Sequence, residues 1–239
     1  MSRNRMSGSG MSGSRAEAAS AGRSVVGRAR RPQRSRTPFV VAGSVVLAVV
    51  ALFAVYTSSA TGDAVAADRY DVGDPGIGAT APDLVLPNVT AAAGGPAPTV
   101  RLSDYRGETV LLYFHEGLGC QPCWDQIRDL ESDPGLLASA GIDQLLTITS
   151  GPQDLIAQKM RDDGLTAPAL ADTDLAVSAQ WEANRFGMMG NSRNGHTFVL
   201  VGPDGVIQWR ADYGGAPNYT MYVPGAQLLD DLRATRQAG

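Results

Sequence analysis

The chain has 239 residues, a length that allows one or two domains, and its formal net charge at pH 7 is −4. This value averages two opposite regions: residues 1–37 hold nine arginines and one acid, a net charge of +8, whereas the rest holds 11 Lys and Arg and 23 acids, a net charge of −12. The basic region has no aromatic or helical pattern, so we expect a disordered tail and no nucleic-acid partner.

An uncharged, apolar segment follows the basic tail. Residues 38–62 carry no charge, and the apolar run from Phe39 to Tyr56 has about the length that a helix needs to cross roughly 30 Å of hydrocarbon. Because this run is apolar on every side, it predicts one transmembrane helix over residues 38–57. The preceding arginines favour a cytoplasmic N-terminus and an extracytoplasmic C-terminal domain, as in a single-pass protein of the cell membrane. A cleaved signal peptide is the alternative, because AVA at residues 64–66 resembles a cleavage site.

The remaining chain divides into a linker and one domain. Residues 58–78 are rich in small and turn-forming residues, which predicts a linker, and residues 79–238 alternate strand and helix patterns. We expect strands over 109–114, 143–149, 196–201 and 205–211, and helices over 121–132, 153–163, 172–183 and 225–236. The turn G-P-D-G at residues 202–205 predicts a hairpin between the last two strands. This order of elements predicts an α/β domain with a mixed sheet covered on both faces.

Both cysteines of the chain lie in the segment LLYFHEGLGCQPCWDQI, residues 111–127. In an exported domain two thiols normally oxidise, but a bridge from Cys120 to Cys123 closes almost no loop, which argues against a structural role. Cys120 falls where the predicted helix begins, and the helix N-terminus favours its thiolate, so we expect Cys120 to attack and Cys123 to resolve a mixed disulfide. Pro122 fits the first turn of that helix, where a missing N–H costs nothing.

The segments IGATAPDLVLPN, VRLSDYRGETVLLYF, GCQPCW and HTFVLVGPDGVIQWR carry a family resemblance. Residues 74–213 resemble a thioredoxin-fold redoxin of the alkyl hydroperoxide reductase and thiol-specific antioxidant family, and they are similar to membrane-anchored thiol-disulfide oxidoreductases. The resemblance implies a thioredoxin-like fold, a mixed central sheet flanked by helices, with Cys120 as nucleophile and Cys123 as resolving cysteine. It also implies thiol or disulfide proteins outside the cytoplasm as partners, and no cofactor besides the redox-active disulfide.

Departures from that family keep two other functions open. Peroxiredoxins place Pro and Thr seven and three residues before their reactive cysteine, where this chain has Tyr113 and Gly117, which argues against the alternative of a thiol peroxidase. Thioredoxins carry a cis-proline that leaves a backbone edge open to substrate, and the matching residue here is His196. His196 is expected to be either a strand-end histidine with a satisfied hydrogen bond or a side chain that faces the cysteine pair and, when protonated, stabilises the Cys120 thiolate. Alternatively, Cys120, Cys123 and His196 would bind copper, as in Sco-type copper chaperones, although those space their cysteines by three residues.

The residues that flank the cysteines have less specific signals. Glu116 is expected to be a solvated loop acid that could relay protons for Cys123, and His115 to be a packing residue at the end of a strand. Trp124 is expected to contribute to the core and to the mouth of the site. The tyrosines of DYGGAPNYTMYVP, residues 212–224, favour an ordered loop over the core, with a substrate-binding lip as the alternative.

Overall fold

The computed structural model describes residues 46–51, 69–92 and 95–238. The chain divides into two units, Met1–Ala48 and Val49–Gly239, and the account below concerns the second. The predicted basic tail and most of the predicted membrane segment lie outside the described residues, although residues 46–51 are helical. Within these ranges, none of the helices has the length and apolar character needed to span a bilayer.

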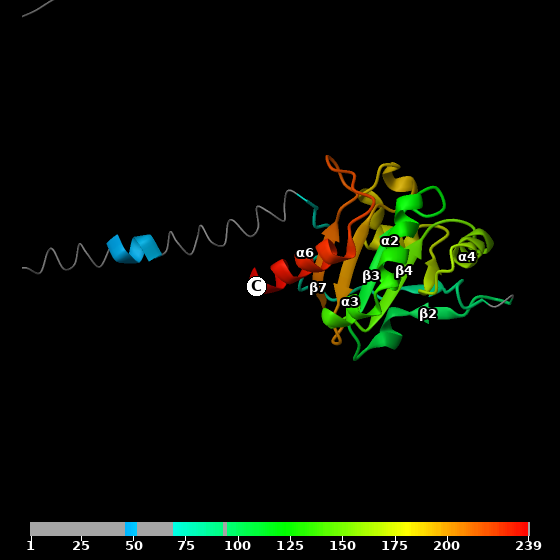
Figure 1. Cartoon of the computed structure of the whole chain (residues 1–239), viewed down its shortest axis with the longest axis horizontal. Helices are drawn as coiled ribbons and strands as arrows, with labels where there is room; N and C mark the ends of the chain where they lie inside the picture. Colours follow the sequence, from blue (N-terminus) through cyan, green and yellow to red (C-terminus); the bar gives the residue numbers. More distant parts are fainter. Residues whose placement is uncertain (1–45, 52–68, 93–94, 239) are drawn as a thin grey trace, which may run out of the picture. The chain divides into compact units, whose positions relative to one another are not determined.

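A five-stranded sheet with the order β5-β4-β3-β6-β7 forms the centre of the domain (Figure 1). Strands β3 (Val110–His115), β4 (Gln144–Thr149) and β5 (Ala169–Ala171) are parallel, whereas β6 (Thr197–Val201) and β7 (Ile207–Asp212) are antiparallel neighbours. The G-P-D-G turn joins β6 to β7, and the Gly202 N–H donates to the Val206 carbonyl at 2.9 Å. The predicted mixed sheet and its hairpin are therefore confirmed.

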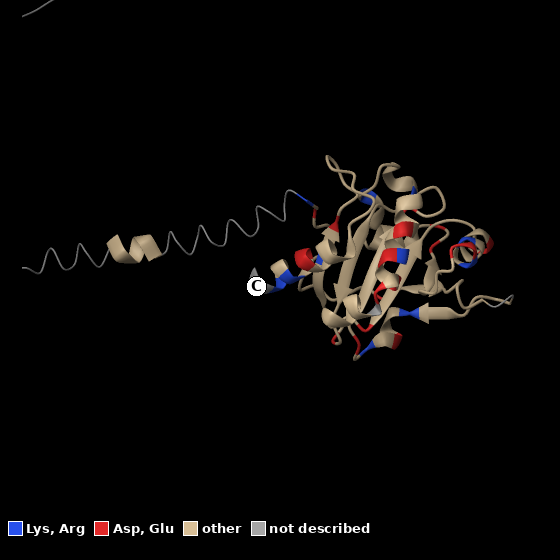
Figure 2. Cartoon of the chain, in the orientation of Figure 1, with Lys and Arg blue, Asp and Glu red and all other residues tan. Residues whose placement is uncertain are grey.

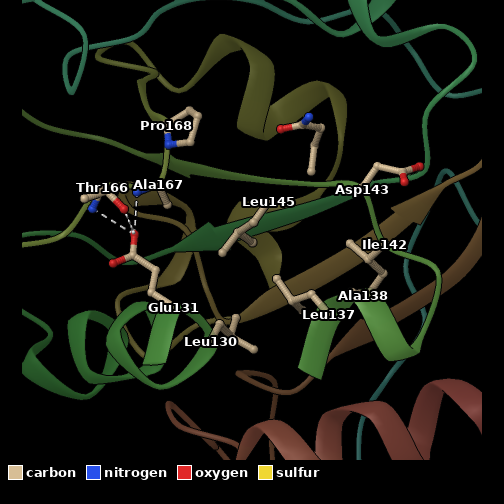
Figure 3. A pocket seen from close by; sticks show the side chains of 11 residues that line it. Leu130, Glu131, Leu137, Ala138, Ile142, Asp143, Leu145, Thr166, Ala167 and Pro168 are labelled. Carbon is tan, nitrogen blue, oxygen red and sulfur yellow. Dashed lines mark hydrogen bonds between the residues drawn. The ribbon is translucent and has the colours of Figure 1, made fainter. Parts of the chain in front are cut away.

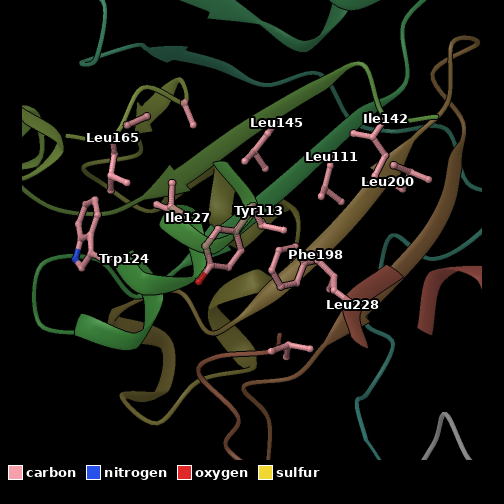
Figure 4. Close-up of a cluster of buried hydrophobic side chains, with 14 of the residues drawn as sticks. Leu111, Tyr113, Trp124, Ile127, Ile142, Leu145, Leu165, Phe198, Leu200 and Leu228 are labelled. Atoms are coloured by element: carbon pink, nitrogen blue, oxygen red, sulfur yellow. The ribbon is translucent and has the colours of Figure 1, made fainter. Parts of the chain in front are cut away.

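Helices cover one face of the sheet. Helix α2 (Gln121–Ser132), α4 (Gln153–Asp162) and α6 (Gly225–Ala238) bury their apolar sides against it. Figure 4 shows Trp124 and Ile127 of α2 beside Tyr113 of β3, with Leu228 of α6 close to Phe198 of β6. All six residues of β3 are buried, as expected for a central strand that is covered on both sides.

The N-terminal part of the domain covers the other face. It contains β1 (Val85–Pro87), its antiparallel partner β2 (Thr99–Arg101) and the short 3₁₀ helix η1 (Leu102–Tyr105). This layer and the residues around α5 (Ala176–Gln180) enclose a second apolar cluster, which includes Leu84, Leu102, Leu112, Phe114, Ile148 and Trp181. Short elements complete the chain: α3 (Pro134–Ser139), η2 (Ala183–Arg185) and η3 (Gly190–Ser192).

The folded part of the chain begins earlier than the sequence predicts. Asp71 exchanges two backbone hydrogen bonds with Asp212 at the end of β7, at 3.1 and 2.8 Å. The Gly73 N–H donates to the Asp212 carboxylate at 2.7 Å, and the fully buried Arg210 forms an ion pair with that carboxylate at 2.8 Å. Residues from Arg69 to residue 78, expected as linker, are therefore attached to the sheet, because the buried Asp212 needs these donors.

Candidate active site

The two cysteines form a disulfide at the N-terminus of α2. Cys120 is the N-cap residue, and its Sγ accepts a hydrogen bond from the Cys123 N–H at 3.3 Å. Pro122 is the second residue of the helix, where an N–H would have no helical partner. Cys120 is 5% exposed and Cys123 is completely buried, so Cys120 is the more accessible cysteine of the pair.

A tight turn connects β3 to the disulfide. Gly117 has a φ of +91°, and a Cβ atom there would lie 2.4 Å from Thr149 Oγ1, so the turn requires glycine. The Gly117 carbonyl accepts the Cys120 N–H at 2.9 Å and the Trp124 indole N–H at 3.0 Å. Trp124 is fully buried, as expected for a core residue, and its indole also fixes the turn before the disulfide.

A hydrogen-bonded pair of side chains lies behind the disulfide. His196 directly precedes β6, and its Nδ1 is 2.9 Å from the hydroxyl of Tyr113. The same hydroxyl also lies 3.4 Å from the Cys123 carbonyl, which is a second acceptor for its proton. The Nε2 atom of His196 is buried without a hydrogen-bond partner. Sequence reasoning missed Tyr113 as a site residue because its strand pattern indicates only core packing.

Burial keeps both histidines neutral. It lowers the pKa of His115 to about 3. The pKa of His196 is also lowered to about 3, mainly by burial and to a smaller extent by the neighbouring His115. In the oxidised site His196 is therefore a neutral imidazole near pH 7, and not an imidazolium. His115 stacks on Tyr113 at 5.1 Å between ring centres, and its ring nitrogens have no partners, so it is a packing residue, as expected.

Glu116 differs from the expectation of a solvated loop acid. It is only 6% exposed, because the end of β3 and the loop before β6 enclose it. Arg193 of that loop donates to the Glu116 carbonyl at 3.3 Å. Burial raises the pKa of the Glu116 carboxyl, and the positive charge of Arg193 opposes this shift. A carboxyl group with a raised pKa thus adjoins the turn that leads to Cys120.

The backbone edge beside His196 is closed by the chain itself. The Gly195 N–H donates to the Ala183 carbonyl at 3.0 Å, and the His196 N–H donates to the Phe186 carbonyl at 3.3 Å. The His196 carbonyl accepts the Tyr213 N–H at 2.8 Å. A Cβ atom on Gly195 would lie 1.3 Å from the Phe186 carbonyl oxygen, so glycine is required for this close approach. Both peptide groups next to His196 are already paired.

Met221 covers the disulfide from the loop after β7. It is 8% exposed and forms a small apolar cluster with Cys120 and Cys123. The next part of this loop is held on α2, where the Val223 N–H donates to the buried Gln126 side chain at 2.7 Å. The predicted ordered loop is therefore present, but its contact with the disulfide has no sequence signal, since a methionine among tyrosines indicates no particular neighbour.

Two further observations concern ligands. Across the ranges that the structure describes, no group of three or more His, Cys, Asp and Glu side chains is arranged to hold a metal ion. A cavity of about 430 Å³ lies between α2, α3 and β4, lined by Leu130, Glu131, Leu137 and Leu145 among others (Figure 3). Leu130 and Glu131 belong to the end of α2 that is farthest from Cys120, so this cavity is separate from the disulfide.

An α/β sheet of this topology, with a C-x-x-C disulfide at the start of the helix after its central strand, defines a thioredoxin-like redoxin. Residues 77–210 match the AhpC/TSA family, which is more than half of the 239-residue chain. The chain belongs to this family, and the expected fold and family are confirmed.

Individual relatives agree with this assignment. Two putative peroxiredoxins of Mycobacterium tuberculosis, from strains CDC 1551 and H37Rv, are each 34% identical to the chain over 107 residues. The match covers 44% of this chain and 63% of the relatives' length. Peroxidoxin BcpB of the same species superposes with a TM-score of 0.53 at 18% identity, over 67% of this chain and 96% of its own. The reduced 2-Cys peroxiredoxin of Plasmodium vivax gives a TM-score of 0.53 at 18% identity, over 67% and 82%.

Proposed function

We propose that this protein is a membrane-anchored, extracytoplasmic thiol–disulfide oxidoreductase that exchanges disulfides with thiol proteins. The observation that carries the proposal is the position of the Cys120–Cys123 disulfide at the N-terminus of α2. A thiolate at Cys120 would be stabilised by the first helical N–H groups, one of which already points at its sulfur. The charge asymmetry and apolar segment of the N-terminal region support the anchored, extracytoplasmic location.

The reaction follows from the different exposure of the two cysteines, 5% for Cys120 and 0% for Cys123. A partner thiolate attacks Cys120 Sγ, the Cys120–Cys123 bond breaks, and Cys123 leaves as a thiolate that takes up a proton. A second thiolate of the partner then attacks the mixed disulfide and releases Cys120 as a thiolate. The partner loses two electrons and the protein gains them, and in the reverse direction the reduced pair reduces a partner disulfide. The chemistry needs no cofactor beyond the cysteine pair.

A thiol peroxidase is the second candidate, because the relatives from Mycobacterium tuberculosis are named putative peroxiredoxins. In that reaction the Cys120 thiolate would attack a hydroperoxide, yielding a sulfenic acid and an alcohol or water. Cys123 would then form the disulfide and release water. Tyr113 is fully buried in the core, and Gly117 offers no hydroxyl to hold a peroxide, so the site gives less support to this function.

The reduction potential of the Cys120–Cys123 pair tests the proposal most directly. It is measured by equilibrating the full chain in detergent with dithiothreitol redox buffers and trapping the thiols. We expect one two-electron transition within the range of known thiol–disulfide catalysts, roughly −270 to −120 mV. A potential below about −300 mV would identify a structural disulfide and refute the proposal. Consumption of thiol that depends on added peroxide would support the peroxidase instead.

A further inference from the structure

The chain's own backbone occupies the edge on which an extended polypeptide could pair next to the disulfide. Ala183 and Phe186 use their carbonyl groups to pair with Gly195 and His196, and Tyr213 pairs with His196 from the other side. The backbone segments around Phe186 and Gly214 approach each other closely, because a Cβ atom on Gly214 would also lie 2.3 Å from the Phe186 carbonyl oxygen. A partner therefore has no free backbone groups to pair with at His196.

Exposed apolar side chains gather on the two loops that adjoin this closed edge. In residues 69–92 and 95–238, eight large apolar side chains are exposed, and four of them lie on these loops. Met188 and Met189 are 56% and 55% exposed, and Tyr219 and Tyr222 are 46% and 39% exposed. We call these four residues the collar. Such a concentration of apolar surface on so few residues is typical of a contact surface.

The two loops that carry the collar adjoin the disulfide. Tyr219 and Tyr222 flank Met221, which lies against both cysteines. The loop with Met188 and Met189 is joined to the turn before Cys120 through the hydrogen bond of Arg193 with Glu116. The two loops also meet, because a Cβ atom on Gly215 would lie 3.2 Å from the ring of Phe186. In Figure 1 both loops lie at the edge of the sheet where α2 begins.

On its α2 side the collar adjoins two carboxylates, Asp129 and Asp125, of which Asp125 also pairs with Arg128 at 2.5 Å. The Tyr222 hydroxyl lies beside Asp129 and near Asp125. Partial burial raises the pKa of this hydroxyl, and the two carboxylates raise it further. Figure 2 colours the Asp and Glu positions of the ribbon red, including those of α2, and residues 38–239 carry 11 Lys and Arg against 23 acids. A partner with Lys or Arg near its cysteine would approach this surface faster than an acidic one.

We infer that the collar is the docking surface for a protein partner whose reactive cysteine has apolar and basic neighbours, and that docking uses side chains instead of strand pairing. This inference rests on the proposed thiol–disulfide exchange and names the partner of that site. The partner's thiolate attacks Cys120 Sγ after its apolar neighbours displace water from the collar, and Cys123 leaves with the electron pair of the broken bond. The closed edge excludes strand pairing, and the recessed disulfide requires a protruding cysteine.

Synthetic peptides with one cysteine test the inference on the oxidised full chain in detergent. The first peptide has Leu and Lys around its cysteine, the second is the same peptide N-methylated on the flanking backbone amides, and the third carries Glu in place of Lys. Rates of mixed-disulfide formation are read by acid quench and mass spectrometry at low salt. We expect the N-methylated peptide to react within about twofold of the first, and the acidic peptide about tenfold more slowly. A tenfold loss on N-methylation would show strand pairing and overturn the inference.

Variants separate docking from chemistry. The double variant Met188→Ser with Met189→Ser should slow the Leu–Lys peptide by about five- to twentyfold, because apolar contact area is lost. Reduction by dithiothreitol, which is too small to touch the collar, should stay unchanged. Val85→Ser is the matched control, because Val85 is 44% exposed but lies on β1. An equal slowing with dithiothreitol, or an equal effect of Val85→Ser, would overturn the inference. A wild type that dithiothreitol cannot reduce would refute the proposed function itself, whereas ready reduction with no peptide preference refutes only the docking surface.

Discussion

The hydroxyl of Tyr113 lies 2.9 Å from Nδ1 of His196. Both residues are fully buried, and this is the only hydrogen bond that the described part of the structure gives to the His196 ring. This side-chain hydrogen bond thus adds to the backbone ladder between the strand that leads to the disulfide and its antiparallel neighbour.

Removing this contact should cost stability. Tyr113→Phe leaves the His196 Nδ1 atom buried without a hydrogen-bond partner, which typically costs about 1–3 kcal/mol. We expect the midpoint of urea unfolding to fall accordingly, with the slope of the transition unchanged. Tyr219→Phe is the control, because this tyrosine is 46% exposed, and it should change stability by less than about 0.5 kcal/mol. If both variants unfold at the wild-type midpoint, Tyr113 does not hold His196.

Lowering the pH should destabilise the domain already at pH values well above those at which most carboxylates titrate. The folded pKa values of His115 and His196 are about 3, below the unfolded value of 6.5, so between pH 6.5 and 3 the unfolded chain binds protons that the folded chain does not. Stability is therefore full above pH 6.5 and falls as the pH is lowered, by about 1.4 kcal/mol per pH unit for each histidine. Urea titrations at half-unit steps measure this slope.

A substitution at His115 isolates half of that effect. Both ring nitrogens of His115 are buried without partners, and the ring stacks on Tyr113 and meets the edge of Trp124. His115→Phe keeps an aromatic ring and removes the unsatisfied polar atoms, so we expect a gain of about 1–2 kcal/mol at pH 7. The acid slope should be about half that of the wild type. An unchanged slope would mean that His115 does not resist protonation.

Trapping experiments should distinguish the roles of the cysteines. In Cys123→Ser, the Cys120 thiolate forms mixed disulfides that no internal thiol resolves, so partners should accumulate on the protein. In Cys120→Ser, the remaining sulfur is completely buried, and trapping should largely vanish. Non-reducing gels with an antibody to the protein give the yield. Equal trapping by the two variants would contradict the assignment of attack to Cys120.

The apolar segment should retain the protein in membranes. Leu47→Arg places a charge near the middle of the predicted helix, at a cost of about 2.5–3.5 kcal/mol on insertion scales. We expect more of the protein in the soluble fraction, measured by fractionation and carbonate extraction. Ala60→Arg, which lies outside the apolar run, is the control and should fractionate as the wild type. Full retention of Leu47→Arg would count against this segment as the anchor.

The sequence predicts the strands with long apolar runs, because such runs identify central strands. The predicted bounds of β3, β4, β6 and β7 differ from the observed ones by at most two residues. Strands β1, β2 and β5 have three residues each, too few for a period to show. The helix predicted over 172–183 contains only α5, because Leu175 and Glu182 adopt positive φ angles of 61° and 50° that interrupt it.

The site is predictable where chemistry is local in sequence. Cys120, Pro122 and Cys123 lie within one helical turn, and their positions follow from the strand, turn and helix pattern. Contacts across the fold carry no such signal. The pairing of Tyr113 with His196, 83 positions apart, and the closure of the edge by residues 183–187 depend on the alignment of distant segments.

The buried ion pair of β7 also sets where the chain can be cut. The family match ends at Arg210, so a fragment of residues 77–210 would keep this buried guanidinium and lose Asp212, its carboxylate partner. It would also lose Gly73 and the Pro75 carbonyl, which bind the same pair. Leaving one member of a buried pair typically costs about 3–5 kcal/mol, a large part of the stability of a domain. A soluble fragment suited to crystals or spectroscopy should therefore begin at or before Arg69, whose guanidinium pairs with Asp231, and extend through α6.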